Sequence, residues 1–511
     1  MDITTGISPD LRDTPPRATT RDWIGLAVLA LALLLLAVDA TVLDIAVPAI
    51  SADLAPSTTQ LLWIIDVYSF VLAGLLVVMG NLGDRIGRRT LLLIGAAGFG
   101  LASLLAAWAV SPEMLIAARV LQGITGATLM PATLGLIRSM FHDPRQRTFA
   151  IGVWGAMAGG GAAAGPLLGG WLLEHYWWGS VFLVNMPIML ALIALGPLLI
   201  PESKDPNPGR FDIPSAVLSM LALVPFVYAV KEIAAHGLSP ATLVAAVVGV
   251  SAGVLFVRRQ RTLERPMLDL RLFAVPQFRT AVVTNLLAVF ALAGVLFFGS
   301  QYLQLVLGHS PLQAGMLLLP GMVASVVGSL LAAVLVRWWR PTSVLGGSLA
   351  LAALGSALFL WLTADAATGM APFVLGFGLI GTGVGIALTV SSDLVVSSAP
   401  AERAGAAAAI SETAYETGIA LGVAVLGSIV MAVFRNGIDV SALPADAAGT
   451  AVESLGGVAD LAGQLPAAAG ASLLGSAHES FVTGIHLASV GIAGILLVAA
   501  VVAFRSRAAR S

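Results

Sequence analysis

Long apolar stretches follow one another along almost the whole chain and limit what it can fold into. A helix needs roughly 20 mostly apolar residues to cross a bilayer. Fourteen such stretches are present, centred near residues 36, 69, 100, 126, 160, 190, 222, 249, 291, 325, 353, 384, 419 and 492. Only 11% of the 511 residues are charged, whereas a soluble globular domain has about 25%. The sequence therefore predicts an all-α membrane protein with 14 transmembrane helices.

The distribution of arginine and lysine predicts how the chain is oriented. Of the 26 basic residues, all but Arg119, Lys231 and Arg435 fall in segments that share one side of the membrane. Short loops rich in these residues stay in the cytoplasm. We therefore predict a multi-pass protein of a bacterial inner (cytoplasmic) membrane, with cytoplasmic tails at residues 1–22 and 505–511. The first apolar stretch is too long for a signal peptide and is expected to be a retained span.

Composition also argues against several classes of function. The chain has no cysteine, which excludes disulfides, thiolate metal sites and cysteine nucleophiles. Its six histidines make no metal-binding spacing, and no nucleophile and base are paired in the sequence. No basic face is available for nucleic acid. We therefore expect a transporter without cofactor or metal, and neither a membrane enzyme nor a receptor-like scaffold.

A weak internal repeat predicts the domain organisation. The segment 141–147 leads into a span rich in Gly and Ala, and the segment 399–403 does the same. Such repeats are the usual construction of secondary transporters. The repeat predicts six-helix bundles over 23–205 and 280–504, two additional transmembrane helices over 206–257 and an interfacial linker helix over 258–279. The long outer segment 435–480, rich in acidic residues, is either a tolerated surface loop or a gate that attracts cations.

Charged residues inside the spans are candidates for function, because charge in hydrocarbon is costly. Asp39 and Asp66 each lie roughly 12 to 17 Å below the outer surface at 1.5 Å per residue. Arg119, about 8 Å deep by the same rise, is a candidate partner for Asp39 or for Asp44. A static buried ion pair is the alternative interpretation.

Glu412 and Glu416 lie four residues apart, so they share one helix face. Two buried like charges repel, and one of them is then expected to hold a proton near neutral pH and release it when a cation arrives. A solvent-exposed helix face is the alternative. Asp393 is equally compatible with a loop anchor and with a residue of the transport pathway.

Two glycine-rich motifs are candidates for conformational change. Residues 80–89 read Gly-Asn-Leu-Gly-Asp-Arg-Ile-Gly-Arg-Arg, and Asp84 there can pair with an arginine or lie at a helix N-terminus as part of a latch. In the fifth span, glycines four residues apart permit close helix packing, and Pro166 weakens the local hydrogen-bond ladder. A packing seam alone is the alternative for this span. The residues predicted to act in conformational change are Gly80, Gly83, Asp84, Arg85, Gly87, Arg88, Gly161, Gly165, Pro166 and Gly169.

These segments resemble the major facilitator superfamily, whose inner loop between spans two and three carries the 80–89 signature. The fifth span is similar to the motif of its drug:proton antiporters. Residues 38–48 are similar to the motif of the fourteen-span branch, except that Asp44 stands where that branch usually has Asn. Residues 63–69 are similar to the quaternary-ammonium exporters of the QacA and SmvA type.

The resemblance implies a proton-coupled multidrug efflux antiporter that exports lipophilic cations, such as quaternary ammonium compounds, dyes and biocides, by alternating access. The alternative is the same fold exporting a neutral or anionic antibiotic or metabolite. The expected partners are small-molecule drugs, protons and membrane lipid, with no nucleic acid, and the expected state is a monomer.

Candidate site residues follow from these arguments together. Aromatic rings can hold a lipophilic cation by stacking, although most membrane aromatics face lipid or pack. Predicted for proton coupling are Asp39, Asp66, Arg119 and Glu416. Predicted for substrate binding are Asp66, Trp63, Tyr68, Tyr415, Glu412, Glu416 and Phe298.

Overall fold

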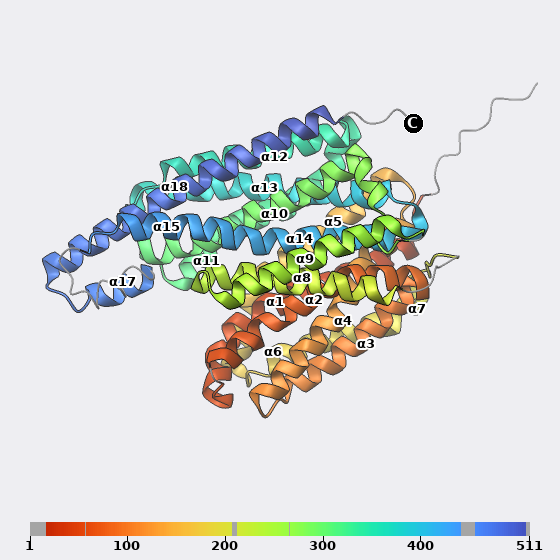
Figure 1. The fold of residues 1–511 in the computed structure, drawn as a ribbon, viewed down its shortest axis with the longest axis horizontal. Coiled ribbons are helices and arrows are strands. Elements are labelled where there is room, and N and C mark those ends of the chain that lie inside the picture. Colours follow the sequence, from red (N-terminus) through yellow and green to blue (C-terminus); the bar gives the residue numbers. More distant parts are fainter. Residues whose placement is uncertain (1–16, 57, 207–211, 265, 441–454, 507–511) are drawn as a thin grey trace, which may run out of the picture.

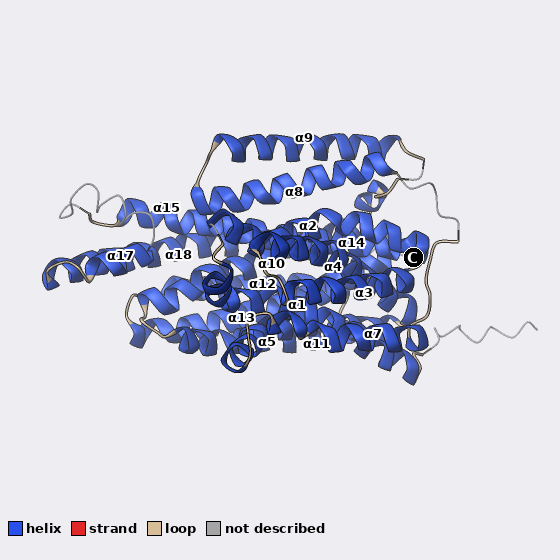
Figure 2. Cartoon of the chain, turned by 90° about the horizontal axis from the view of Figure 1, so that it is seen from below, coloured by secondary structure: helices blue, strands red, loops and turns tan. Residues whose placement is uncertain are grey.

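The computed structural model describes residues 17–56, 58–206, 212–264, 266–440 and 455–506, and the regular structure in these ranges is entirely helical (Figure 2). In lipid, backbone polar groups must find partners within the span, and a helix satisfies them internally. Thirteen of these helices are long and apolar enough to cross a membrane, and the pair Pro144–Ala162 and Leu167–His175, bent by 45°, makes a fourteenth span. The prediction of fourteen spans is confirmed.

The N-terminal bundle is built from the first seven helices. They are α1 Thr20–Leu54, α2 Thr58–Ile86, α3 Arg88–Ala107, α4 Pro112–Met140, α5 Pro144–His175, α6 Ser180–Leu183 and α7 Asn185–Leu199. Side-chain N-caps begin α4 and α5: Ser111 Oγ accepts from the amide of Met114 at the start of α4, and Asp143 accepts from the amides of Arg145 and Gln146 at the start of α5. Such side chains satisfy amides that have no partner within the helix.

The C-terminal bundle has the same helical character. It contains α10 Pro276–Gln301, α11 Pro311–Trp338, α12 Pro341–Leu358, α13 Ala366–Ser398, α14 Ala404–Leu421, α15 Gly427–Gly437 and α18 Ala467–Arg505, with π-helical turns η2 Tyr302–Val306 and η5 Gly422–Leu426 and 3-10 turns η3 Phe359–Trp361 and η4 Ala401–Arg403. Its core is aromatic: the Phe359 and Phe373 rings stack at 5.5 Å.

Two additional helices, α8 Ile213–His236 and α9 Pro240–Thr262, form a hairpin on one side of the molecule (Figures 1 and 2). Asp212 accepts hydrogen bonds of 3.0 and 2.8 Å from Arg259, which ties the two helices together. Val227 of α8 packs in one cluster with Phe70 of α2 and Ala420 of α14. The hairpin therefore covers the seam between the two bundles on that side.

The linker between the hairpin and the C-terminal bundle differs from the prediction. A helix over 258–279 is wrong, because α9 ends at Thr262 and only a 3-10 turn follows, η1 Leu270–Ala274. The apolar residues of the linker pack on protein and do not form the apolar face of a helix. Met267 is buried in the N-terminal core, and Phe273 packs against Phe278 of α10 at 5.2 Å.

The described parts of the outer segment 435–480 are largely helical. Helix α15 extends to Gly437, α17 spans Leu455–Ala462 and α18 begins at Ala467. Leu455 and Val458 are buried in the core of the C-terminal bundle, which explains why α17 packs there. Residues 441–454 lie outside the described residues, so the predicted gate stays a prediction.

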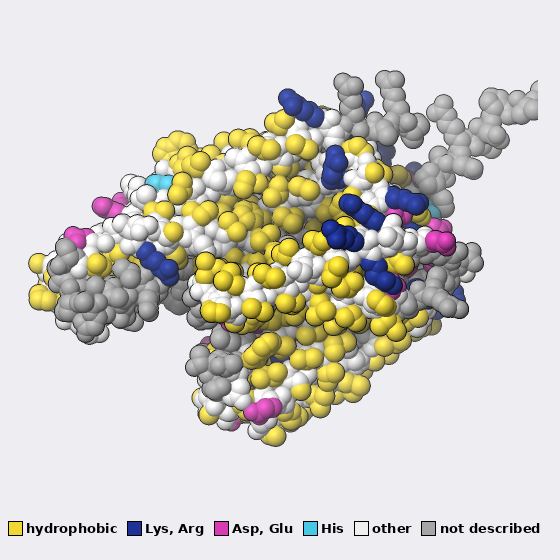
Figure 3. Space-filling model, in the orientation of Figure 1, with side chains coloured by type: hydrophobic (Ala, Val, Ile, Leu, Met, Phe, Trp, Pro, Cys, Tyr) yellow, Lys and Arg dark blue, Asp and Glu magenta, His cyan; other side chains and the backbone are white. Residues whose placement is uncertain are grey.

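The two bundles meet at one end of the molecule and diverge toward the other (Figure 1). Lysine and arginine side chains gather at the end where the bundles meet (Figure 3), which we call the arginine-rich end. Close helix approach there depends on glycine: a Cβ on Gly80 of α2 would lie 2.6 Å from the carbonyl oxygen of Gly405 in α14. A Cβ on Gly152 of α5 would lie 2.5 Å from the carbonyl oxygen of Ser329 in α11.

Candidate functional site

Asp39 of α1 and Arg119 of α4 form a buried ion pair inside the N-terminal bundle. Arg119 Nη1 lies 2.9 Å from Asp39 Oδ2, and each residue is 1% exposed. Two charges taken out of water are stable together only when their remaining hydrogen-bonding capacity is satisfied. Of the two partners considered for Arg119, the structure pairs it with Asp39; the Asp44 side chain lies outside the described residues.

Three polar side chains complete the surroundings of Asp39. Asn185 Nδ2 donates to Asp39 Oδ1 at 2.9 Å, and Gln122 Nε2 approaches the same oxygen at 3.4 Å. Both amides also donate to Ser103 Oγ at 3.0 Å. The Asp39 carboxylate and the Ser103 hydroxyl together thereby join α1, α3, α4 and α7. Asn185 and Ser103 were not predicted, although an Asn within an apolar span is itself a signal.

Helix α2 closes the site on another side. Arg119 Nε donates to the carbonyl oxygen of Ile64 at 3.3 Å. The guanidinium carbon lies 4.4 Å from the centroid of the Tyr68 ring, a cation-π contact. Tyr68, which was predicted to bind substrate, is buried in this state and contacts Arg119. Glu416 of α14 lies within electrostatic range of Tyr68, which connects this site to the C-terminal bundle.

Asp66 lies on a different side of α2 from Tyr68. It is two residues from Tyr68 in α2, and therefore about 200° around the helix. It is partly exposed, and so shares the more open side of α2 with Trp63, which is 43% exposed and packs edge-on against Phe70 at 6.3 Å. Asp66 therefore points to a different side of α2 from Tyr68, the residue that contacts Arg119.

The predicted acidic pair lies in α14. Glu412 is 5% exposed, which excludes the solvent-exposed face considered for it, whereas Tyr415 and Glu416 are partly exposed. Glu412 and Glu416 both lie within electrostatic range of Tyr415. One residue before Glu412, Ser411 accepts a 2.7 Å hydrogen bond from Asn285 of α10, which fixes this part of α14 against its bundle.

Phe298 lies elsewhere. It is 1% exposed in the core of the C-terminal bundle and packs edge-on against Phe359 at 6.3 Å. This placement argues against the substrate contact predicted for it. A buried aromatic and a substrate-facing aromatic have the same sequence signal when only the helix position is known.

Asp84 of α2 binds the N-terminus of α14 across the two bundles. Its carboxylate accepts hydrogen bonds from the backbone amides of Gly405 at 3.0 Å and Ala406 at 2.9 Å. It also pairs with Arg88 Nε at 2.8 Å, and Arg88 in turn donates to the Ala401 carbonyl at 2.8 Å. Asp84 therefore both pairs with an arginine and lies at a helix N-terminus, the two arrangements considered for it. A negative charge is favoured at a helix N-terminus, so this contact holds the arginine-rich end closed.

A second ion pair crosses the bundles at the same end. Arg147 Nε of α5 lies 2.5 Å from Asp393 Oδ1 of α13, and Thr148 Oγ1 donates to the other carboxylate oxygen at 2.7 Å. Asp393 is thus an anchor between bundles in this state.

The glycines of the fifth span pack against α1. A Cβ on Gly161 would overlap the carbonyl oxygen of Leu34, and one on Gly165 would overlap Thr41. These contacts bring the backbones of α5 and α1 close together over about one helical turn. The side chain of Pro166 lies outside the described residues.

Comparison with known proteins assigns the family. A family profile for the Major Facilitator Superfamily matches residues 29–423. The chain belongs to the major facilitator superfamily. Its fold, two six-helix bundles plus two inserted helices, is that of the superfamily. Solved structures agree: the human organic anion transporter MFSD10 has a TM-score of 0.60 at 15% identity and covers 96% of this chain and all of the other.

Several superfamily members are similar over nearly their full length. The multidrug efflux pump LfrA of Mycolicibacterium smegmatis is 49% identical over 95% of this chain and 96% of its own. The methyl viologen resistance protein SmvA of Salmonella typhimurium is 39% identical over 93% and 96%. The tetracenomycin C resistance and export protein of Streptomyces glaucescens is 34% identical over 96% and 92%.

Proposed function

We propose that this protein is a proton-coupled antiporter that exports lipophilic cations from a bacterium by alternating access. Short basic loops remain in the cytoplasm, so we take the arginine-rich end as cytoplasmic, with both termini there, in the inner membrane. The described conformation is then closed toward the cytoplasm. We propose further that the protein works as a monomer, without a cofactor, on the energy of the proton gradient.

The buried Asp39–Arg119 pair is the observation that carries proton coupling. A proton on Asp39 would cancel the charge that compensates Arg119, and Arg119 would have to find other partners in Gln122, the Ile64 carbonyl and the Tyr68 ring. The Asp39 carboxylate of α1 accepts hydrogen bonds from α4 and α7, and the donor amides also bind Ser103 of α3. Protonation of Asp39 would therefore loosen the packing of these four helices. A proton thereby favours one of two arrangements, as coupling requires.

Acidic residues on the seam support a cationic substrate. Glu416 is partly exposed, and Asp66 is partly exposed on the side of α2 that Tyr68 does not occupy. Glu416 also lies within electrostatic range of Tyr68 in the opposite bundle, so it is placed to attract a cation that enters between the bundles. The resistance of a relative to methyl viologen, which is a dication, agrees with this substrate class.

A neutral or anionic substrate is the second candidate, favoured by one relative that exports tetracenomycin C. The two candidates differ in the charge of the substrate and share the fold. If the substrate is neutral or anionic, carboxylates that face the seam would contribute nothing to substrate affinity.

Ethidium export from energised cells, with and without a protonophore, tests the proposal. We expect export that the protonophore abolishes, and its loss in Asp39→Asn and in Asp66→Asn. Glu174→Gln, at an exposed carboxylate of α5, is the matched control and should export normally. A well-expressed protein that exports tetracenomycin-like neutral compounds but no ethidium would favour the second candidate. Export that the protonophore leaves intact would contradict proton coupling.

A further inference from the structure

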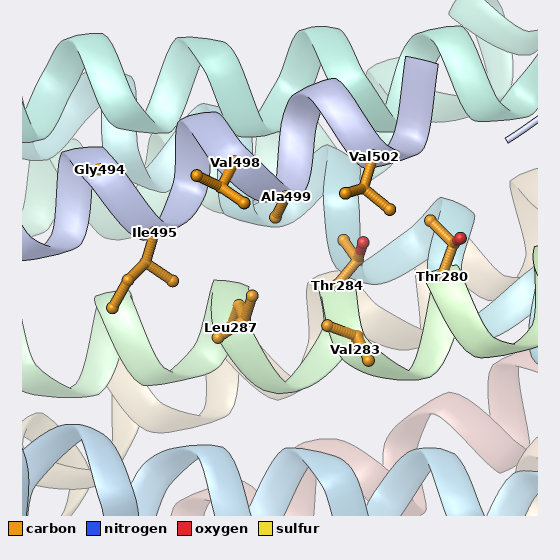
Figure 4. A pocket seen from close by; sticks show the side chains of 9 residues that line it. All are labelled: Thr280, Val283, Thr284, Leu287, Gly494, Ile495, Val498, Ala499 and Val502. Carbon is orange, nitrogen blue, oxygen red and sulfur yellow. The ribbon is translucent and has the colours of Figure 1, made fainter. Parts of the chain in front are cut away.

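A groove of about 320 Å³ lies between α10 and α18, two helices of the C-terminal bundle (Figure 4). Its lining residues from α10 are Thr280, Val283, Thr284 and Leu287, and those from α18 are Gly494, Ile495, Val498, Ala499 and Val502. Several of the apolar side chains are open to the surroundings; Val498, for example, is 65% exposed. In a membrane, these surroundings are lipid chains, so the groove suits an acyl chain.

Basic residues extend both walls of the groove toward the arginine-rich end. Arg279 lies four residues before Val283 on α10, and Arg505 lies three residues after Val502 on α18, so each continues its wall by one helical turn. Both arginines are exposed, and within the described part of the chain neither has a carboxylate partner. Two exposed arginines therefore lie about one helical turn beyond the apolar groove, toward the arginine-rich end.

We propose that this groove binds an anionic phospholipid of the inner leaflet, with an acyl chain between α10 and α18 and the phosphate at Arg279 and Arg505. Basic pockets between transmembrane helices on the cytoplasmic side recognise acidic headgroups in this way. Planar guanidiniums bind phosphate through paired hydrogen bonds. The inference uses the proposed orientation, and its test measures lipid binding, so it can fail while transport is retained.

The position of the groove distinguishes this lipid from an exported substrate. Both walls belong to the C-terminal bundle, so a rigid movement of the two bundles would leave the groove unchanged. A transported molecule needs a site that opens alternately, and a cation would be repelled by Arg279 and Arg505. A lipid that fills the space between α10 and α18 would instead stabilise the bundle in every state.

Native mass spectrometry of the purified full chain tests the proposal, with phosphatidylglycerol and phosphatidylcholine of identical acyl chains. We expect the anionic lipid to bind at least about tenfold more tightly. The Arg279→Gln/Arg505→Gln double variant should lose this preference. The matched control is Arg337→Gln/Arg340→Gln, which removes two exposed arginines at the end of α11 and the N-cap of α12 and should retain the preference.

A second pair of variants locates the acyl chain. Val498→Trp fills the groove and should weaken binding of both lipids, whereas Val501→Trp, at an exposed residue outside the lining, should not. Equal affinity for the two lipids, equal losses in the two arginine pairs, or no effect of Val498→Trp would each overturn the proposal. So would displacement of phosphatidylglycerol by ethidium, because the groove would then be a substrate site.

Discussion

The carboxylate of Asp84 accepts a 3.0 Å hydrogen bond from the backbone amide of Gly405, which belongs to the opposite bundle. The two residues are 321 positions apart in the chain. This contact, with the neighbouring amide of Ala406, makes the N-terminus of α14 a binding site for the end of α2. Any movement that opens the arginine-rich end must break it.

Removal of the charge at Asp84 should open that end. In Asp84→Asn, we expect the closed state to lose about 1.5 to 3 kcal/mol, the value of hydrogen bonds to a charged group. Spin labels at His142→Cys and Arg340→Cys, both exposed and in different bundles, would report the distance between the two bundles at this end. Because the chain has no native cysteine, these would be the only labelled residues. Asp212→Asn, which breaks an ion pair within the hairpin, should leave the distance distribution unchanged. A distribution in Asp84→Asn identical to that of the native protein would refute the latch.

The Asp39–Arg119 pair should behave as one unit in unfolding experiments. Arg119→Leu leaves a buried carboxylate without its cation and should destabilise the protein by about 3 to 5 kcal/mol. The double variant Asp39→Asn/Arg119→Leu should be less destabilised than the sum of the two single changes, because residues in one network are coupled. Thermal unfolding of the detergent-purified protein measures this. Strictly additive effects would mean that the two side chains do not interact.

The sequence predicted this pair from helix depth, which follows from residue count. Depth does not determine the direction in which a side chain points: Asp66 and Tyr68 have similar depths but differ by about 200° around α2. The burial of Phe298 in the core of the C-terminal bundle could not be inferred from its position for the same reason. The spans and the motif at 80–89 were predictable, because hydrophobic length and local motifs are encoded by neighbouring residues. The linker turn and α17 depend on packing against distant parts of the chain, which no local pattern contains.

Close packing of α5 on α1 should be sensitive to single methyl groups. Gly165→Ala places a Cβ against Thr41, and overpacking of this kind costs typically about 1 to 3 kcal/mol. Gly170→Ala is the matched control, because nothing lies within 4 Å of its Cβ position. The two variants should differ clearly in melting temperature and in export. Equal melting temperatures for the two variants would contradict this prediction and show that α5 and α1 can move apart to accept the added methyl group.

Glu416 should contribute to affinity for cations and not for neutral compounds. In Glu416→Gln we expect the apparent KM for ethidium to rise about tenfold, equivalent to about 1.4 kcal/mol, while neutral substrates are unaffected. Glu402→Gln, at an exposed side chain near the start of α14, serves as control. An equal loss for charged and neutral substrates would indicate a structural role for Glu416.

Transport by Asp39→Asn in proteoliposomes tests proton coupling most directly. Two assays on the same preparation separate the steps: exchange of labelled for unlabelled ethidium without a gradient, and uptake driven by an imposed pH gradient. If Asp39 carries the coupling proton, the variant should retain exchange and lose the pH-driven uptake that the native protein shows. Uptake that follows the pH gradient as strongly in Asp39→Asn as in the native protein would contradict the account.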